Sequence, residues 1–149
     1  KKCVLFAQFL KNDQSGEVTA LKESPYVTYF SDLDMPKGFY YDMNDEQKKA
    51  LCISQRKLFE DMKQSLSLIP SEEVGLLVLD ELTYVYAWGI LDKEDDLSFL
   101  KNKPKTLEIV ITGRKPEQEL LDLADYITEM KMEKHPFLKG ISARKGIEC

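Results

Sequence analysis

Apolar residues in this chain follow two patterns, short continuous runs and three- to four-residue spacing. The runs are rich in β-branched and aromatic residues and predict buried strands. Runs of this kind lie at 3–10 (CVLFAQFL), 25–30 (PYVTYF), 75–80 (GLLVLD) and 106–112 (TLEIVIT), and a shorter one at 125–130 (DYITEM). Continuous rather than alternating apolar strands are typical of parallel sheets that are covered on both faces.

Helices are predicted between these strands. The longest begins at Asn44, a suitable N-cap, and continues to about Leu68, after which Pro70 ends the pattern. Shorter helices are predicted at 15–22 with Ser15 as the cap, from 81 to about 89, at 93–103 after Asp92, and at 117–124. Alternating strands and helices predict an α/β fold with a mostly parallel sheet flanked by helices.

Composition narrows the class of protein. A length of 149 residues is typical of one domain, and a net charge of -5 argues against a nucleic acid or an anionic membrane as partner. No apolar run is long enough to span a membrane. The three cysteines are widely spaced and odd in number, which favours a reduced, cytoplasmic protein. The single histidine, His135, argues against a zinc site.

Two carboxylates, Asp80 and Glu81, directly follow the apolar run 75–79. Ligands of parallel α/β sheets bind at the carboxyl ends of the strands. An apolar strand that ends in Asp-Glu is typical of the second nucleotide-binding motif of P-loop ATPases, because magnesium on phosphates takes hard oxygen ligands. The alternative is structural: Glu81 begins the next helix and Asp80 caps it.

The next strand ends in Thr112, Gly113 and Arg114. Because parallel strands end at a common edge, we expect Asp80 and Thr112 to lie at the same edge of the sheet. A hydroxyl, a glycine that allows close backbone approach and a guanidinium suit a phosphate group. The alternative is a strand-to-helix turn with a surface arginine.

An aromatic stretch, Gly38-Phe39-Tyr40-Tyr41, lies in the irregular segment before the long helix. These rings suit a hydrophobic clamp over a flat ligand. The alternative is a loop that packs its aromatic residues into the core.

Several motifs together resemble the P-loop family of corrinoid adenosyltransferases, over nearly the whole chain. The strongest are LDELTY (79–84), ITGR (111–114), LADYITEM (123–130), KHPF (134–137) and KGIE (145–148), with QFLK (8–11), GE (16–17) and GFYY (38–41) before them. The resemblance implies a P-loop NTPase (RecA-like) architecture. It also implies an enzyme that transfers the 5′-deoxyadenosyl group of ATP to the cobalt of a cob(I) corrinoid and releases triphosphate, in adenosylcobalamin biosynthesis or salvage.

The resemblance also implies roles for individual residues. Glu81 is expected to hold Mg²⁺ with Asp80 behind it, and Thr112, Gly113 and Arg114 to contact the nucleotide phosphates. Phe39, Tyr40 and Tyr41 are expected to bind the corrinoid, with Phe39 and Tyr41 as a wedge that displaces the lower axial ligand of cobalt. The expected partners are a reducing protein such as a flavodoxin and a second copy of the chain in a homodimer.

The chain departs from the family pattern in two places. It contains no G-x-x-x-x-G-K-[ST] phosphate loop. The expectation is therefore a single domain, 1–149, that lacks the N-terminal strand, phosphate loop and helix. The aromatic stretch has Tyr40-Tyr41 where the family often has Thr-Trp. Two alternatives stay open: a non-catalytic relative that binds a corrinoid or a partner protein, and a fragment of another P-loop ATPase or kinase.

Overall fold

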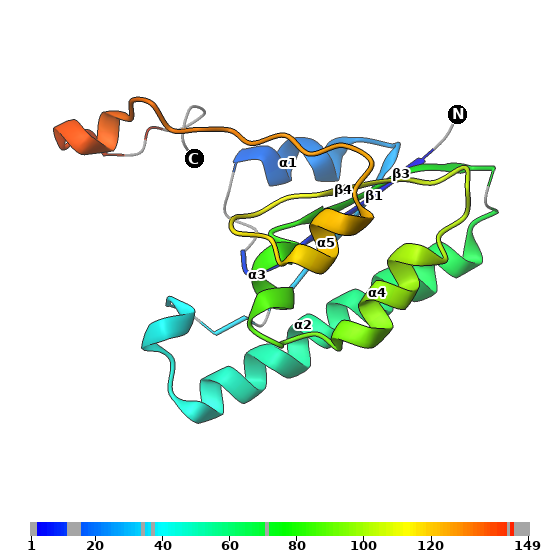
Figure 1. Cartoon of the computed structure of the whole chain (residues 1–149), viewed down its shortest axis with the longest axis horizontal. Helices are drawn as coiled ribbons and strands as arrows, with labels where there is room; N and C mark the ends of the chain where they lie inside the picture. Colours follow the sequence, from blue (N-terminus) through cyan, green and yellow to red (C-terminus); the bar gives the residue numbers. More distant parts are fainter. Residues whose placement is uncertain are drawn as a thin grey trace.

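A computed structural model of the chain describes residues 3–11, 16–33, 35–36, 38–70, 72–142 and 144. Within them, four parallel strands form one sheet in the order β2-β1-β3-β4 (Figure 1). The strands are β1 (Cys3–Gln8), β2 (Val27–Ser31), β3 (Val74–Asp80) and β4 (Glu108–Ile111). The helices are α1 (Gly16–Glu23), α2 (Asp45–Leu68), α3 (Leu82–Ala87), α4 (Lys93–Lys101) and α5 (Gln118–Leu123), with 3₁₀ turns η1 (Tyr40–Asp42) and η2 (Pro136–Lys139).

Helices cover the sheet from both sides, as the apolar strands predict. In Figure 1, α2 and α4 lie on one side of the sheet and α1 lies on the other. Rings of α2 and α4 meet, with the Phe59 and Phe99 centroids 5.6 Å apart. On the opposite side, Lys22 of α1 lies 5.4 Å from the ring centroid of Tyr29 in β2. The core contains fully buried residues of β1 and β3: Leu5, Ala7, Leu77 and Leu79.

The long helix α2 begins and ends where the sequence predicts. The side chain of Asn44 accepts from the backbone N–H of Gln47, and the Gln47 side chain accepts from the backbone N–H of Asn44. This capping box satisfies two backbone donors at the start of the helix. One face of the helix is buried through Leu51, Gln55, Leu58, Phe59 and Met62.

The strand order reverses between β1 and β3. From β1 the chain passes through α1 to β2 on one side, and from β3 it passes through α3 and α4 to β4 on the other. A crevice forms at the carboxyl ends of two neighbouring strands whose connections leave in opposite directions. The topology therefore places a ligand site beside Gln8 and Asp80, which are register partners at these strand ends.

The predicted strand at 125–130 is wrong. This segment forms no strand in the structure, and Tyr126 and Met130 are each 94% exposed. Its β-branched and aromatic residues favour a strand, but a strand needs a paired neighbour and a packed face, and context decides. The proposed cap Ser15 lies outside the described residues. Within the described ranges, no helix is both long and apolar enough to cross a membrane.

Candidate functional site

The carboxyl ends of β1, β3 and β4 bring together residues that are far apart in the sequence. Lys11, just beyond β1, donates to Asp80 Oδ2 over 3.0 Å, and its Nζ lies 4.0 Å from Glu81 Oε1. Thr112, just beyond β4, donates to Asp80 Oδ1 over 2.6 Å. The predicted placement of Asp80 and Thr112 at one edge of the sheet is therefore confirmed.

Asp80 organises this edge rather than capping the next helix. Its two oxygens accept from Lys11 and Thr112, and the Thr112 hydroxyl accepts from the backbone N–H of Glu81 over 3.1 Å. The N-cap of α3 is Glu81, which makes no side-chain capping hydrogen bond. The structural alternative is therefore confirmed in one part and wrong in the other: the helix does begin at Glu81, its N-cap, but Asp80 does not cap it.

Glu81 has a backbone conformation that is uncommon for a residue with a side chain. Its φ is 61° and its ψ is 19°, in the left-handed region. Its Oε2 atom is buried and has no hydrogen-bond partner among the described residues. An unpaired buried carboxylate oxygen is unfavourable unless a ligand satisfies it. Strained residues of this kind cluster at functional sites.

Gln8 supplies a second unpaired polar atom at the same edge. Its side chain is fully buried, and Oε1 accepts from the Tyr29 hydroxyl. Its Nε2 has no hydrogen-bond partner among the residues that the structure describes. A buried acceptor on Glu81, directly after β3, and a buried donor on Gln8, the last residue of β1, are thus both unpaired among the described residues.

Lys11 supplies an ammonium group to this site. Partial burial is the largest single effect on the pKa of Lys11 and acts to lower it. The hydrogen bond and charge of Asp80, together with the charges of Glu81 and Glu17, outweigh burial, so the pKa lies above its ordinary value and the ammonium stays protonated at neutral pH. Sequence reasoning missed Lys11 as a site residue, although it belongs to the QFLK motif.

The turn after β4 requires a glycine. Gly113 has φ of +141°, and a Cβ atom there would lie 1.9 Å from Thr83 Oγ1. The Thr83 hydroxyl donates to the backbone oxygen of Arg114 over 3.1 Å, which fixes the turn on α3. Arg114 is exposed at this edge. Contact of Thr112, Gly113 and Arg114 with phosphate stays a prediction.

The aromatic stretch lies mainly on the surface. Phe39 is 80% exposed and Tyr41 is 77% exposed, so these two rings do not pack into the core. Tyr40 between them is half-buried and stacks on Trp88, with ring centroids 4.3 Å apart and an interplanar angle of 10°. Trp88 was not among the predicted site residues.

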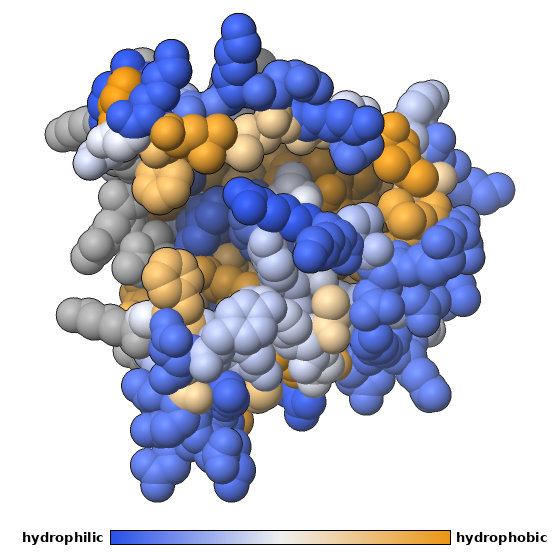
Figure 2. Space-filling model, turned by 60° about the vertical axis from the view of Figure 1, so that its left-hand side comes forward, coloured by the Kyte–Doolittle hydropathy of each residue, from blue (hydrophilic) through white to orange (hydrophobic). Residues whose placement is uncertain are grey.

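The side of the molecule near the carboxyl ends of the strands is hollowed. Figure 2 brings this side forward and shows hydrophobic side chains at the back of the hollow, with hydrophilic side chains projecting across it. Exposed rings and unpaired buried polar atoms together are suited to a ligand with both a flat apolar part and a charged part.

Comparison with known proteins decides among the families that share this fold. A family model described as ATP:corrinoid adenosyltransferase BtuR/CobO/CobP matches residues 1–149. The chain belongs to the ATP:corrinoid adenosyltransferase family. The resemblance predicted from the sequence motifs is confirmed, and the parallel sheet fits the P-loop NTPase architecture expected of the family.

Three relatives named corrinoid adenosyltransferase illustrate the similarity. The chain is 30% identical to the protein from Sinorhizobium sp over 142 residues, which are 95% of this chain and 64% of the relative. It is 33% identical to the protein from Pseudomonas aeruginosa over 95% of this chain and 66% of the relative. It is 33% identical to the protein from Escherichia coli K12 over 99% of this chain and 71% of the relative. The chain thus spans about two thirds of the length of these adenosyltransferases.

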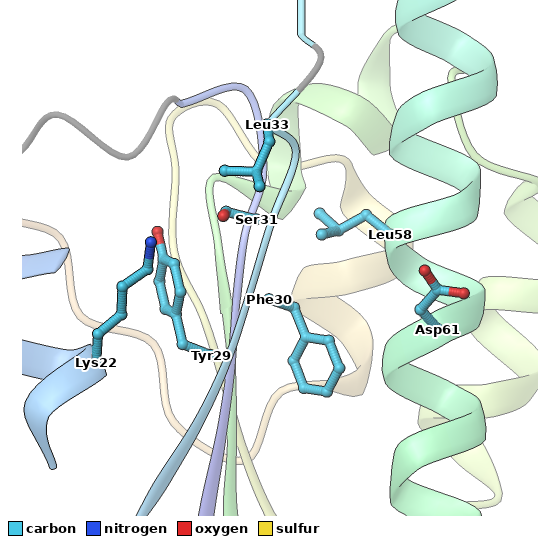
Figure 3. Close-up of a pocket in the computed structure, with 7 residues that line it drawn as sticks. All are labelled: Lys22, Tyr29, Phe30, Ser31, Leu33, Leu58 and Asp61. Carbon is cyan, nitrogen blue, oxygen red and sulfur yellow. The ribbon is translucent and has the colours of Figure 1, made fainter.

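A separate hollow lies at the outer edge of β2 and shares no residue with the predicted adenosyltransferase site. Its volume is about 290 Å³. Figure 3 shows that its lining side chains lie on both sides of β2 and on the facing turn of α2. They are Lys22, Tyr29, Phe30, Ser31, Leu33, Leu58 and Asp61.

Proposed function

We propose that the intact protein transfers the 5′-deoxyadenosyl group of ATP to the cobalt of a cob(I) corrinoid. The cobalt–carbon bond forms as the bond between C5′ and the triphosphate oxygen breaks. Cobalt gives up two electrons, passing from Co(I) to Co(III), and triphosphate leaves. Family membership supports this reaction, and the structural observation that carries it is the buried Oε2 atom of Glu81, which has no hydrogen-bond partner among the described residues.

The residues present fit magnesium as the counter-ion of the triphosphate. Mg²⁺ is commonly held by one or two carboxylates together with phosphate oxygens and water. Glu81 has a buried oxygen free to bind, and Asp80 beside it is held in place by Lys11 and Thr112. No group of three or more Cys, His, Asp or Glu side chains able to hold a metal occurs in the described ranges. When bound, the ion would neutralise charge on the leaving triphosphate.

Two cationic side chains of the chain are suited to contact the phosphates as well. Lys11 lies between β1 and the carboxylates, and Arg114 is exposed at the same edge. Both side chains supply hydrogen-bond donors and positive charge suited to phosphate oxygens. We assign the remaining phosphate contacts to a strand, phosphate loop and helix that precede these residues. The edge position of β4, with Val110 45% exposed, supports a further strand beside it.

The exposed aromatic residues are the proposed binding site of the corrinoid. Phe39 and Tyr41 present their rings to solvent. A flat macrocycle buries such rings favourably, and a ring against the lower face of cobalt would exclude water there. Removing the lower axial ligand makes cobalt easier to reduce. We further propose cytoplasmic location, a homodimer and a flavodoxin-like electron donor.

Replacement of Glu81 tests this function. In the intact protein, Glu81→Gln keeps the size of the side chain and removes the charge that the nucleotide-bound cation needs. Adenosylation of chemically reduced cob(I)alamin is expected to fall at least about a hundredfold, while the melting temperature changes little. Glu108→Gln is the matched control, because Glu108 is exposed at the opposite, amino end of β4.

Two results would contradict the proposal. Near-normal turnover of Glu81→Gln at saturating magnesium would remove Glu81 from the reaction. Absence of adenosylation by the unaltered intact protein, with corrinoid binding retained, would favour a non-catalytic corrinoid-binding protein instead.

A further inference from the structure

Four aromatic rings gather where α3 ends. Trp88, the C-cap of α3, stacks face to face on Tyr40 at 4.3 Å and contacts the edge of Tyr41, with centroids 5.6 Å apart and an interplanar angle of 74°. Tyr84, one turn earlier on α3, lies 5.2 Å from Trp88. The cluster therefore joins the aromatic stretch to α3 through ring contacts.

The contacts divide the aromatic stretch into one anchored ring and two presented rings. Tyr40 lies between Trp88 and the start of α2, where Lys48 Nζ is 5.4 Å from the Tyr40 ring centroid. Phe39 and Tyr41 on either side of it are mostly exposed. Tyr40 and Trp88 thus hold the stretch, while its neighbours stay available to a ligand.

The same short helix carries the proposed catalytic carboxylate at its other end. Glu81 is the N-cap of α3 and Trp88 is its C-cap. Seven residue steps at about 1.5 Å each place the two ends roughly 10 Å apart along the helix axis. Thr83 ties the helix to the turn after β4, and Val85 and Tyr86 are fully buried in the core. This anchoring fixes Trp88 relative to Glu81.

We propose that Trp88 is a positioning residue for the corrinoid. Its indole holds the stretch from Phe39 to Tyr41 at a fixed distance from Glu81. The bound corrin ring is thereby held at the distance and orientation from the nucleotide that the transfer requires. This inference rests on the proposed function. Trp88 acts through Tyr40 and is not itself a catalytic residue.

The inference makes a prediction that a purely structural role does not. Trp88→Leu keeps apolar bulk and removes the stacked ring, whereas Trp88→Phe keeps a smaller ring. We expect Trp88→Leu to raise the Kd for cob(II)alamin and the corrinoid KM about three- to tenfold, the range of one lost aromatic contact. The KM for ATP should stay within twofold of the unaltered protein. Trp88→Phe should recover at least half of the binding free energy that Trp88→Leu loses.

The matched control is Phe99→Leu. Phe99 is also half-buried and also makes a ring contact, but its partner is Phe59 between α2 and α4. Both leucine variants should lower the melting temperature by a few degrees, and only Trp88→Leu should weaken cob(II)alamin binding. The measurements are anaerobic calorimetric titration of the intact protein with cob(II)alamin in the presence of ATP, and initial rates against each substrate.

Outcomes for the two proposals differ. A cob(II)alamin Kd of Trp88→Leu within twofold of the unaltered protein, or an equal rise in the KM for ATP, would overturn the positioning role. Loss of affinity in Trp88→Leu, in a protein that binds cob(II)alamin but performs no adenosyl transfer, would overturn the proposed function and support the positioning role.

Discussion

Glu81 adopts a conformation that most residues avoid, and its neighbours explain why it persists. A left-handed backbone is unfavourable by about 1–2 kcal/mol for a residue with a side chain. The Glu81 N–H donates to Thr112 Oγ1, and its carbonyl accepts from the N–H of Tyr84 over 3.2 Å. These bonds hold the chain where β3 passes directly into α3. The strained backbone of Glu81 is therefore held by contacts with the turn after β4 and with the first turn of α3.

Phe39 allows a test of the wedge at the residue scale. Because its ring is 80% exposed, Phe39→Ala should change the free energy of unfolding by less than about 0.5 kcal/mol. Adenosylation that begins from cob(II)alamin and a reductant should fall about tenfold or more, since the wedge acts on cobalt coordination. Adenosylation of chemically pre-reduced cob(I)alamin should be much less affected. Parallel rate assays with the two starting corrinoids make the comparison.

Equal losses in the two assays, together with a large drop in melting temperature, would contradict the wedge. Leu33→Ala is a suitable control, because Leu33 is 75% exposed just after β2, six residues before Phe39 in the same connection. It should leave both rates and the melting temperature nearly unchanged.

Asp96 is a buried carboxyl group that the proposed mechanism does not use. It is 2% exposed on α4, and its Oδ2 has no hydrogen-bond partner among the described residues. Burial raises the pKa of Asp96 from 3.8 to about 7; Lys63 opposes this rise. The nearby carboxylates that add to it are Asp95, Asp92 and Glu60. The folded state therefore favours the protonated form of Asp96.

The stability of the protein should accordingly depend on pH through Asp96. A raised pKa in the folded state means that stability falls as pH rises from about 4 to about 7. Asp96→Asn removes this titration, so it should stabilise the protein at pH 8, by at most about 4 kcal/mol at about 1.4 kcal/mol per pKa unit. The gain should shrink toward pH 4. Urea unfolding of both proteins at pH 5 and pH 8 measures it, and an equal gain at both pH values would contradict the prediction.

At the scale of elements, the short helix α3 connects three parts of the site. Glu81 precedes it, Thr83 contacts the turn after β4, and Trp88 ends it against the aromatic stretch. Gly113→Ala tests the contact with the turn. Because a Cβ atom would lie 1.9 Å from Thr83 Oγ1 and φ is +141°, it should destabilise the protein by about 2–3 kcal/mol.

A double variant separates the two causes of that loss. In a Thr83→Ala background the hydroxyl is absent, so Gly113→Ala should be less unfavourable, with a coupling of about 1 kcal/mol. Urea unfolding of the four proteins gives the coupling directly. Strict additivity would mean that backbone strain alone, and not the contact with Thr83, requires glycine at this position.

Much of the fold was predictable because the local sequence patterns favour the same strands and helices that the structure contains. Apolar runs gave β1, β3 and β4 within a few residues, and Asn44 with Pro70 gave both ends of α2. The segment 125–130 has the composition of a strand and forms none. Strand formation depends on partners elsewhere in the chain, which local composition does not report.

The site was predictable only in part. Asp80 and Thr112 were expected together because neighbouring parallel strands end at the same edge of a sheet. The ion pair of Lys11 with Asp80 and the stack of Trp88 on Tyr40 were not expected. Each joins residues separated by more than forty positions, and no spacing rule encodes such a contact. The left-handed backbone of Glu81 likewise has no signature in a sequence.

At the scale of the whole molecule, the doubly wound topology gathers the site from separate segments. The end of β1, the aromatic stretch, α3 with its carboxylates, and the turn after β4 all lie toward the carboxyl ends of the strands. The opposite, amino ends of the strands carry no residue of the proposed site. The proposed site is therefore confined to one end of the sheet.

The stack of Trp88 on Tyr40 has an optical consequence. Trp88 is the single tryptophan in the 149 residues, so their indole fluorescence comes from one place, the joint between α3 and the aromatic stretch. A change in the emission wavelength or lifetime of this indole would report movement of that joint and of little else. The chain thus contains its own spectroscopic probe, about 10 Å along a helix from the carboxylate assigned to the nucleotide.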